Sequence, residues 1–100
     1  KSRLSAILLS AFRRLRLKKE AEEVFALVKV KTVEHYNAMI LLYSSESFEK
    51  PNQFYLEMKQ KNIAPTKVTL AAMLDTCKKW NKLEEGLELL ELILKDLQEF

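Results

Sequence analysis

Side chains that could perform covalent or metal chemistry are scarce in this chain. Its 100 residues include one histidine, His35, and one cysteine, Cys77. These are too few ligands for a structural zinc site, and a single cysteine cannot form an internal disulfide. His35 has no serine, cysteine or carboxylate arranged around it as a catalytic partner, so we expect it at the surface. Cys77 falls in an apolar stripe and is expected in the core. Because paired carboxylates and a glycine-rich phosphate loop are also missing, the sequence predicts no enzyme, no metal site and no cofactor.

The charges that recur along the chain are cationic. Arg13 and Arg14 are followed 65 residues later by Lys78 and Lys79, and both pairs end a predicted helix. A row of such cations would attract phosphate groups and release their counterions. A pair of serines takes the matching place in the middle of the chain, so the row is interrupted. Cations near a helix C-terminus also favour the helix dipole, and a purely structural role therefore stays open.

The net charge of +3 is small, but its distribution is uneven. The first 19 residues hold seven basic residues and no acid, whereas six acids follow from Glu84 onward against Lys95 alone. The basic beginning mildly resembles a transit peptide in composition, yet its place in the repeat described below favours a folded helix. The most apolar stretch, Leu87 to Leu97, is broken by charges, so no membrane span and no membrane partner are expected. The chain starts without Met and stops within a helical pattern, which predicts an internal piece of a longer protein.

The composition favours an all-α protein. One glycine and two prolines cannot supply the tight turns that a β-sandwich or barrel of this length needs. Apolar residues recur instead at helical spacing. The expected helices lie near residues 2–14, 18–30, 33–45, 48–61, 67–80 and 83–98.

The helical pattern repeats. The apolar positions of residues 36–43 recur 34 residues later and 31 residues earlier, and those of residues 51–58 recur 35 residues later and 30 earlier. Each unit is thus a pair of helices, and the units span about 1–32, 33–66 and 67–100, the last truncated. Short helices gain stability by burying an apolar stripe against neighbours, so such pairs stack into an α-solenoid.

Two stretches carry a specific resemblance. Val33–Tyr43 (VEHYNAMILLY) and Tyr55–Thr66 (YLEMKQKNIAPT) resemble the pentatricopeptide repeat, an RNA-binding helical hairpin of about 35 residues. Leu83–Leu90 is similar to the second helix of that repeat. The related tetratricopeptide hairpin has a characteristic Trp, Gly and Tyr spacing that does not occur here. The resemblance implies a right-handed α-solenoid that holds single-stranded RNA on its concave face, in RNA processing or translation. It also implies location in the mitochondrion, with the plastid as the alternative.

The resemblance also implies which residues would read bases. In the family the reader follows the aromatic residue of the first helix and works with the last residue of the repeat. The corresponding pairs are Ala6 with Thr32 and Asn37 with Thr66, while Ala71 has no partner within the chain. An amide offers a donor and an acceptor to a base edge, whereas alanine offers neither. Base specificity is therefore expected to be poor. Asn37 could also be an ordinary polar residue of a first helical turn.

Residues near the start of each first helix would clamp the bases. These positions are Arg3, Glu34 and Val68. Val68 fits the apolar pattern of the family, but Glu34 departs from it and would repel phosphate. A carboxylate in a first helical turn is also favourable to the helix dipole without any ligand.

A protein scaffold is the rival interpretation. Degenerate readers, an interrupted cation row and a last helix that is apolar on several sides would suit a repeat array packed against protein. Such an array could belong to an organelle ribosome or to an RNA-processing complex.

Overall fold

A computed structural model describes residues 2–98, which form six helices. They are α1 (Ser2–Leu15), α2 (Lys18–Leu27), α3 (Val33–Tyr43), α4 (Glu49–Gln60), α5 (Lys67–Lys79) and α6 (Leu83–Leu97). All regular secondary structure in this part of the chain is helical, so the all-α prediction is confirmed. The helix expected over residues 18–30 ends earlier, because Val28 adopts an extended conformation (φ −72°, ψ 117°). The β-branched residues in this link have a lower helix propensity than the leucines and glutamates before them.

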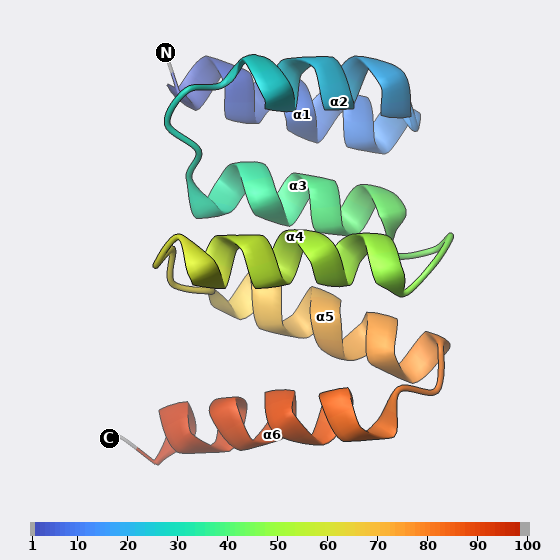
Figure 1. The fold of residues 1–100 in the computed structure, drawn as a ribbon, viewed down its shortest axis with the longest axis vertical. Coiled ribbons are helices and arrows are strands. Elements are labelled where there is room, and N and C mark those ends of the chain that lie inside the picture. Colours follow the sequence, from blue (N-terminus) through green and yellow to red (C-terminus); the bar gives the residue numbers. More distant parts are fainter. Residues whose placement is uncertain (1, 99–100) are drawn as a thin grey trace.

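The helices stack as hairpins along the long axis of a body measuring 36 × 29 × 21 Å (Figure 1). Helix α3 packs against α1 and α5, so these three first helices form a continuous row. Each of α2, α4 and α6 packs beside the first helix that precedes it, and the described ends of the chain lie at opposite ends of the body. This is the arrangement of an all-α repeat fold. The right-handed twist and the repeat boundaries stay predictions.

The middle hairpin contributes most of the core because helices cover it on both sides. Tyr36, Met39 and Ile40 are completely buried. Phe25 of α2 contacts the rings of Tyr36 and Phe54 edge-on, at centroid distances of 5.2 and 5.3 Å, and so joins α2 to the second hairpin. Edge-to-face geometry is favourable for aromatic rings. Cys77 is buried, as predicted.

Three helices end in the same way. Arg16, Asn62 and Asn81 follow α1, α4 and α5 with positive φ angles of 59°, 61° and 56°. In each case the next residue's N–H donates to a carbonyl five residues earlier in the chain, at 2.9 Å. This pattern satisfies carbonyl groups that the helix end would otherwise leave unpaired. The turns between helices are therefore encoded locally.

Candidate nucleic-acid interface

A groove on the row of first helices brings together half of the predicted site. It has a volume of about 350 Å³ and lies between α1 and α3, with α5 at its edge; we call it the α1–α3 groove. The predicted residues that line it are Arg3, Ala6, Arg13, Glu34, Asn37 and Val68. Ile7, Ala38 and Leu41 supply apolar surface. Residues up to 65 positions apart in sequence thus share one surface. Two guanidinium groups against one carboxylate leave the groove with a positive charge.

Asn37 is held by the start of the next hairpin. Its Nδ2 donates to Thr66 Oγ1 at 3.2 Å, and its Oδ1 accepts a hydrogen bond from Thr69 Oγ1. The predicted pair of Asn37 and Thr66 is therefore in direct contact. A primary amide has two N–H donors and two acceptor lone pairs, so one of each remains available for a ligand. Asn37 is 9% exposed, which leaves its amide only a narrow opening to the groove.

His35 is buried, and our expectation of a surface histidine is wrong. Its Nδ1 accepts the backbone N–H of Thr32 at 2.9 Å, and its Nε2 lies 2.7 Å from Ser5 Oγ of α1. Because Nδ1 is an acceptor, the neutral ring carries its proton on Nε2 and donates it to Ser5. Thr32, the predicted partner of Ala6, contacts His35 instead, at 3.0 Å between Oγ1 and Nδ1. The signal in the sequence was the alignment of His35 with Thr69, since both close a capping box that begins with threonine.

The three predicted clamp residues lie near the starts of α1, α3 and α5. Arg3, Glu34 and Val68 are all exposed, and all reach the α1–α3 groove. Glu34 brings a carboxylate into this otherwise cationic surface. Ala71, the third predicted reader, is exposed on α5 and does not line the groove.

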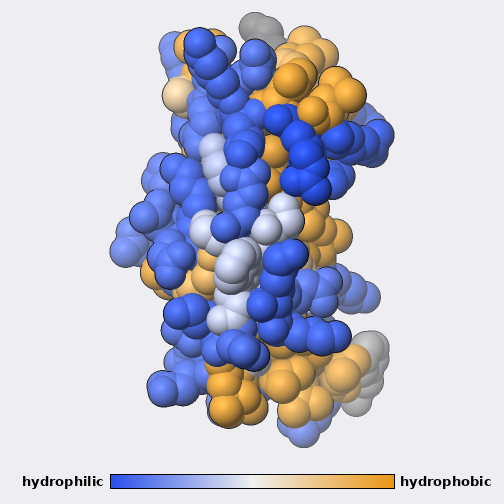
Figure 2. Space-filling model, turned by 90° about the vertical axis from the view of Figure 1, so that its right-hand side faces the viewer, coloured by the Kyte–Doolittle hydropathy of each residue, from blue (hydrophilic) through white to orange (hydrophobic). Residues whose placement is uncertain are grey.

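Only Arg13 of the four predicted phosphate-binding cations lines the α1–α3 groove. Arg14 is exposed outside it, and Lys78 lines a separate hollow between α5 and α6. Lys79 lies 6.0 Å from the ring centroid of Trp80. Figure 2 shows the edge of the molecule where each first helix turns into the second, and it is hydrophilic over most of its length. The cations therefore follow an edge of the molecule and do not line one groove.

One cation on this edge, Arg16, was not among the predicted phosphate contacts. Arg16 Nη1 donates to Ser45 Oγ at 3.2 Å, and so carries positive charge toward the place where the serine pair interrupts the row. Trp80 joins the end of α5 to the end of α3, because its Nε1 donates a hydrogen bond to the backbone carbonyl of Ser44 at 3.0 Å. Lys18 pairs with Glu46 at 2.5 Å, which neutralises one charge nearby. Arg16 ends α1 with a positive φ of 59°, and its guanidinium group reaches Ser45 beyond α3.

No family model matches the chain. Over 73 residues, which cover 72% of the chain, it is 37% identical to a mitochondrial pentatricopeptide repeat-containing protein of Arabidopsis thaliana. Over most of its length, this chain is similar to a pentatricopeptide repeat protein. The chain spans 10% of the length of that relative.

The chemistry that the α1–α3 groove offers is recognition. Guanidinium groups can pair with phosphates, the Asn37 amide can meet a base edge, and aliphatic side chains can contact a base face. Among residues 2–98, no three potential metal ligands cluster together. None of the helices in the same range combines the length and apolar character required to cross a bilayer.

Proposed function

We propose that this chain is part of a pentatricopeptide repeat protein and holds single-stranded RNA along the α1–α3 groove. The observation that supports this most is the convergence of Arg3, Arg13 and Asn37 on one groove of the first-helix row, in a chain similar to a pentatricopeptide repeat protein. The protein acts in the mitochondrion, in RNA processing or translation. It is not an enzyme, and other components supply the chemistry.

Binding rests mainly on charge. Arg3 and Arg13 contact the phosphate backbone, helped from the neighbouring edge by Arg14, Lys78 and Lys79. Asn37 supplies the one amide that can meet a base edge, with Thr66 fixing its orientation. The side chains of Ala6 and Ala71 contribute no hydrogen bond, and the Thr32 hydroxyl is already hydrogen-bonded to His35. Arg3, Glu34 and Val68 border the bases at the helix starts, where the Glu34 carboxylate lowers the affinity.

RNA titration at several salt concentrations tests this function. Each phosphate contact removed should lower the slope of log affinity against log salt by about 0.7 for a single strand. Replacing both Arg3 and Arg13 by Gln should therefore flatten the slope by roughly twice that amount. Lys19→Gln is the matched control, because Lys19 is exposed on α2 and lies outside the groove. Equal slopes for the double variant and the control would contradict RNA binding in the groove.

A protein scaffold within a ribonucleoprotein, such as an organelle ribosome, is the second candidate. It is favoured by the exposure of three leucines on α6: Leu92 at 43%, Leu94 at 55% and Leu97 at 58%. The Asn37 amide, moreover, is already bonded within the chain. On this alternative, a charged residue in place of any of these leucines releases a protein partner from the assembly, whereas Asn37→Ala changes no RNA measurement.

A further inference from the structure

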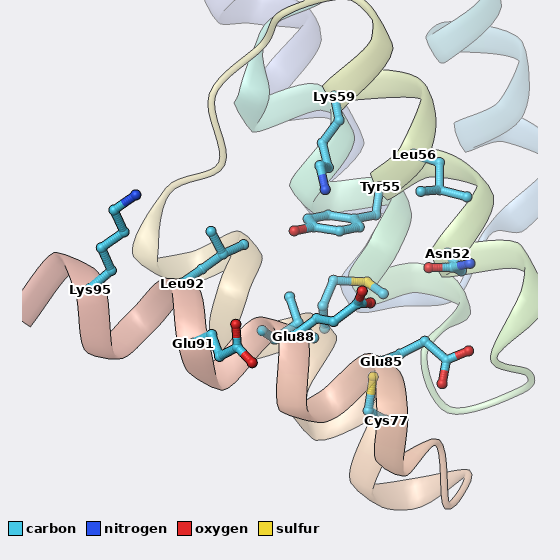
Figure 3. A pocket seen from close by; sticks show the side chains of 12 residues that line it. Asn52, Tyr55, Leu56, Lys59, Cys77, Glu85, Glu88, Glu91, Leu92 and Lys95 are labelled. Carbon is cyan, nitrogen blue, oxygen red and sulfur yellow. The ribbon is translucent and has the colours of Figure 1, made fainter.

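A second groove lies away from the first-helix row, between α4 and α6 (Figure 3). It has a volume of about 490 Å³, and we call it the α4–α6 groove. Met73 and Leu89 contribute apolar surface to it, and both are buried. A further hollow of about 580 Å³ shares Tyr55 and Leu92 with it and extends to Pro65. The two hollows therefore meet at these shared side chains.

The Tyr55 hydroxyl is unsatisfied in this groove. Tyr55 is 6% exposed, and its hydroxyl is the buried side-chain polar atom that finds no hydrogen-bond partner among the described residues. The chain's other two tyrosines, both on α3, each donate to a glutamate at 2.6 Å: Tyr36 to Glu57 and Tyr43 to Glu22. A buried hydroxyl without a partner is costly, and native structures rarely keep one without a reason. Figure 3 shows the Tyr55 side chain extending into the space between α4 and α6.

The wall of the groove on α6 carries three carboxylates and one cation, Lys95. Glu85, Glu88 and Glu91 recur every three residues along it, and none of them forms an ion pair with a described residue. Lys59, on the opposite wall, lies 5.0 Å from the centroid of the Tyr55 ring. Burial, followed by the nearby Glu88 carboxylate, raises the pKa of Tyr55, so the hydroxyl stays protonated and needs an acceptor.

We propose that the α4–α6 groove binds an arginine-bearing segment of a partner protein. The guanidinium group of the partner's arginine pairs with Glu88 and a neighbouring glutamate. A backbone carbonyl of the partner segment accepts a hydrogen bond from the Tyr55 hydroxyl. The planar fork of arginine can donate to two carboxylates at once, which the point charge of lysine does less well. Leu56, Leu89 and Leu92 receive the aliphatic parts of the segment. This site is separate from the proposed RNA groove, and its acids would repel a phosphate backbone.

Binding of a labelled peptide tests the proposal. The probe is acetyl-Leu-Arg-Leu-Arg-Leu-amide, and its control carries citrulline in place of both arginines, which keeps the shape and removes the charge. Fluorescence anisotropy should show binding of the arginine peptide alone. Glu88→Gln should weaken binding about tenfold, as expected for the loss of a hydrogen bond to a charged group. Glu84→Gln is the matched control, because Glu84 is an exposed acid of α6 that does not line the groove.

The variant Tyr55→Phe tests whether the Tyr55 hydroxyl needs an acceptor from a ligand or is already satisfied within the protein. The variant keeps the ring and removes only the unbonded hydroxyl, so it should raise the melting temperature of the free protein and weaken peptide binding. Tyr36→Phe should instead lower the melting temperature, because it removes an existing bond to Glu57. A lower melting temperature for Tyr55→Phe would overturn the proposal, as would equal binding of the citrulline peptide. Displacement of the peptide by single-stranded RNA would likewise assign the groove to RNA.

Discussion

Polar residues at the junctions between hairpins form the same arrangement twice. At the start of α3, Thr32 bonds to His35, which reaches back to Ser5 of α1. At the start of α5, Thr66 bonds to Thr69, which reaches back to Asn37 of α3. Each arrangement satisfies the first backbone N–H groups of a helix and ties it to the previous first helix. Asn37 therefore contributes to stability in addition to its proposed role in RNA recognition.

Replacing His35 measures the strength of one junction. His35→Ala removes the acceptor for the Thr32 N–H and the contact to Ser5, and should lower the free energy of unfolding by about 1–3 kcal/mol. His35→Thr should recover roughly 1 kcal/mol of this loss, because threonine closes the capping box as Thr69 does at α5. Urea denaturation would measure both values. Equal losses for the two variants would show that the imidazole contributes by packing alone.

We expect the contact between Asn37 and Thr66 to set the preference for one base over another. Because the family uses Asn at this position for pyrimidines, we expect a modest pyrimidine preference opposite the second hairpin, below about 1 kcal/mol. Thr66→Asp should sharpen the choice toward uracil, since a carboxylate holds the Asn37 amide more firmly and still caps α5. Asn37→Ala should erase the preference and leave the salt-dependent affinity nearly intact.

Competition between RNAs that differ at one base is the measurement for this contact. Thr32→Asp is the matched control, because it adds the same charge at the start of α3, where the neighbour is His35 instead of Asn37. If the Thr66→Asp protein shows no base preference, Asn37 is not a reader and its role is structural.

At the scale of helices, tyrosine and glutamate pairs lock α3 between its neighbours. Tyr36 bonds to Glu57 of α4, and Tyr43 bonds to Glu22 of α2. Burial, then the bond to Glu57, raises the pKa of Tyr36 above its ordinary value, so the phenol remains a donor at neutral pH. The same bond is the main reason that the pKa of Glu57 lies below its ordinary value of 4.5.

Acid should therefore weaken the lock between α3 and α4. A carboxylate whose pKa is lowered by folding adds stability above its unfolded pKa and loses it as the pH falls through the folded value. The melting temperature should fall when the pH drops below about 4.5, and it should fall less in Tyr36→Phe, which lacks the bond. Glu23→Gln, at an exposed acid of α2, is the control. An identical acid response in the Tyr36→Phe protein would show that other carboxylates dominate.

Both ends of the stack of hairpins present apolar surface. Leu8, Val24 and Val28 line a hollow of about 560 Å³ at the α1–α2 end, and Leu87 and Leu90 line one of about 420 Å³ at the α5–α6 end. By internal alignment, Leu90 corresponds to Phe25 and Tyr55, which the following hairpin buries, but Leu90 itself is 40% exposed. Large exposed apolar patches promote association.

Association through these ends should depend on concentration. We expect sedimentation velocity to show larger species as the protein concentration rises, and Leu87→Lys with Leu90→Lys to suppress them by adding charge to the patch. Leu15→Lys is the control, because Leu15 is 68% exposed but lines neither end hollow. A concentration-independent monomer would show that the end faces do not self-associate.

The positions of the helices could be predicted from the sequence alone, because each helix is encoded by short-range signals. Apolar residues at helical spacing act within a turn or two, so the helix positions could be predicted locally. The pairing of Asn37 with Thr66 came from the resemblance to the pentatricopeptide repeat, and the structure places the two side chains in hydrogen-bond contact. The extended link after Leu27 was not predicted, because the apolar pattern of the sequence continues past the end of α2.

The burial of polar side chains, and the surface that each cation reaches, depend on the tertiary structure. His35 is polar and lies in a first turn, yet packing of α1 on α3 encloses it and supplies Ser5 as a partner. Arg13 and Lys78 are equivalent in the internal alignment, but Arg13 lines the α1–α3 groove and Lys78 lines the hollow between α5 and α6. The unsatisfied Tyr55 hydroxyl was likewise invisible in the sequence. Burial and pairing depend on neighbours that are distant along the chain, and a single sequence records those neighbours only through its repeats.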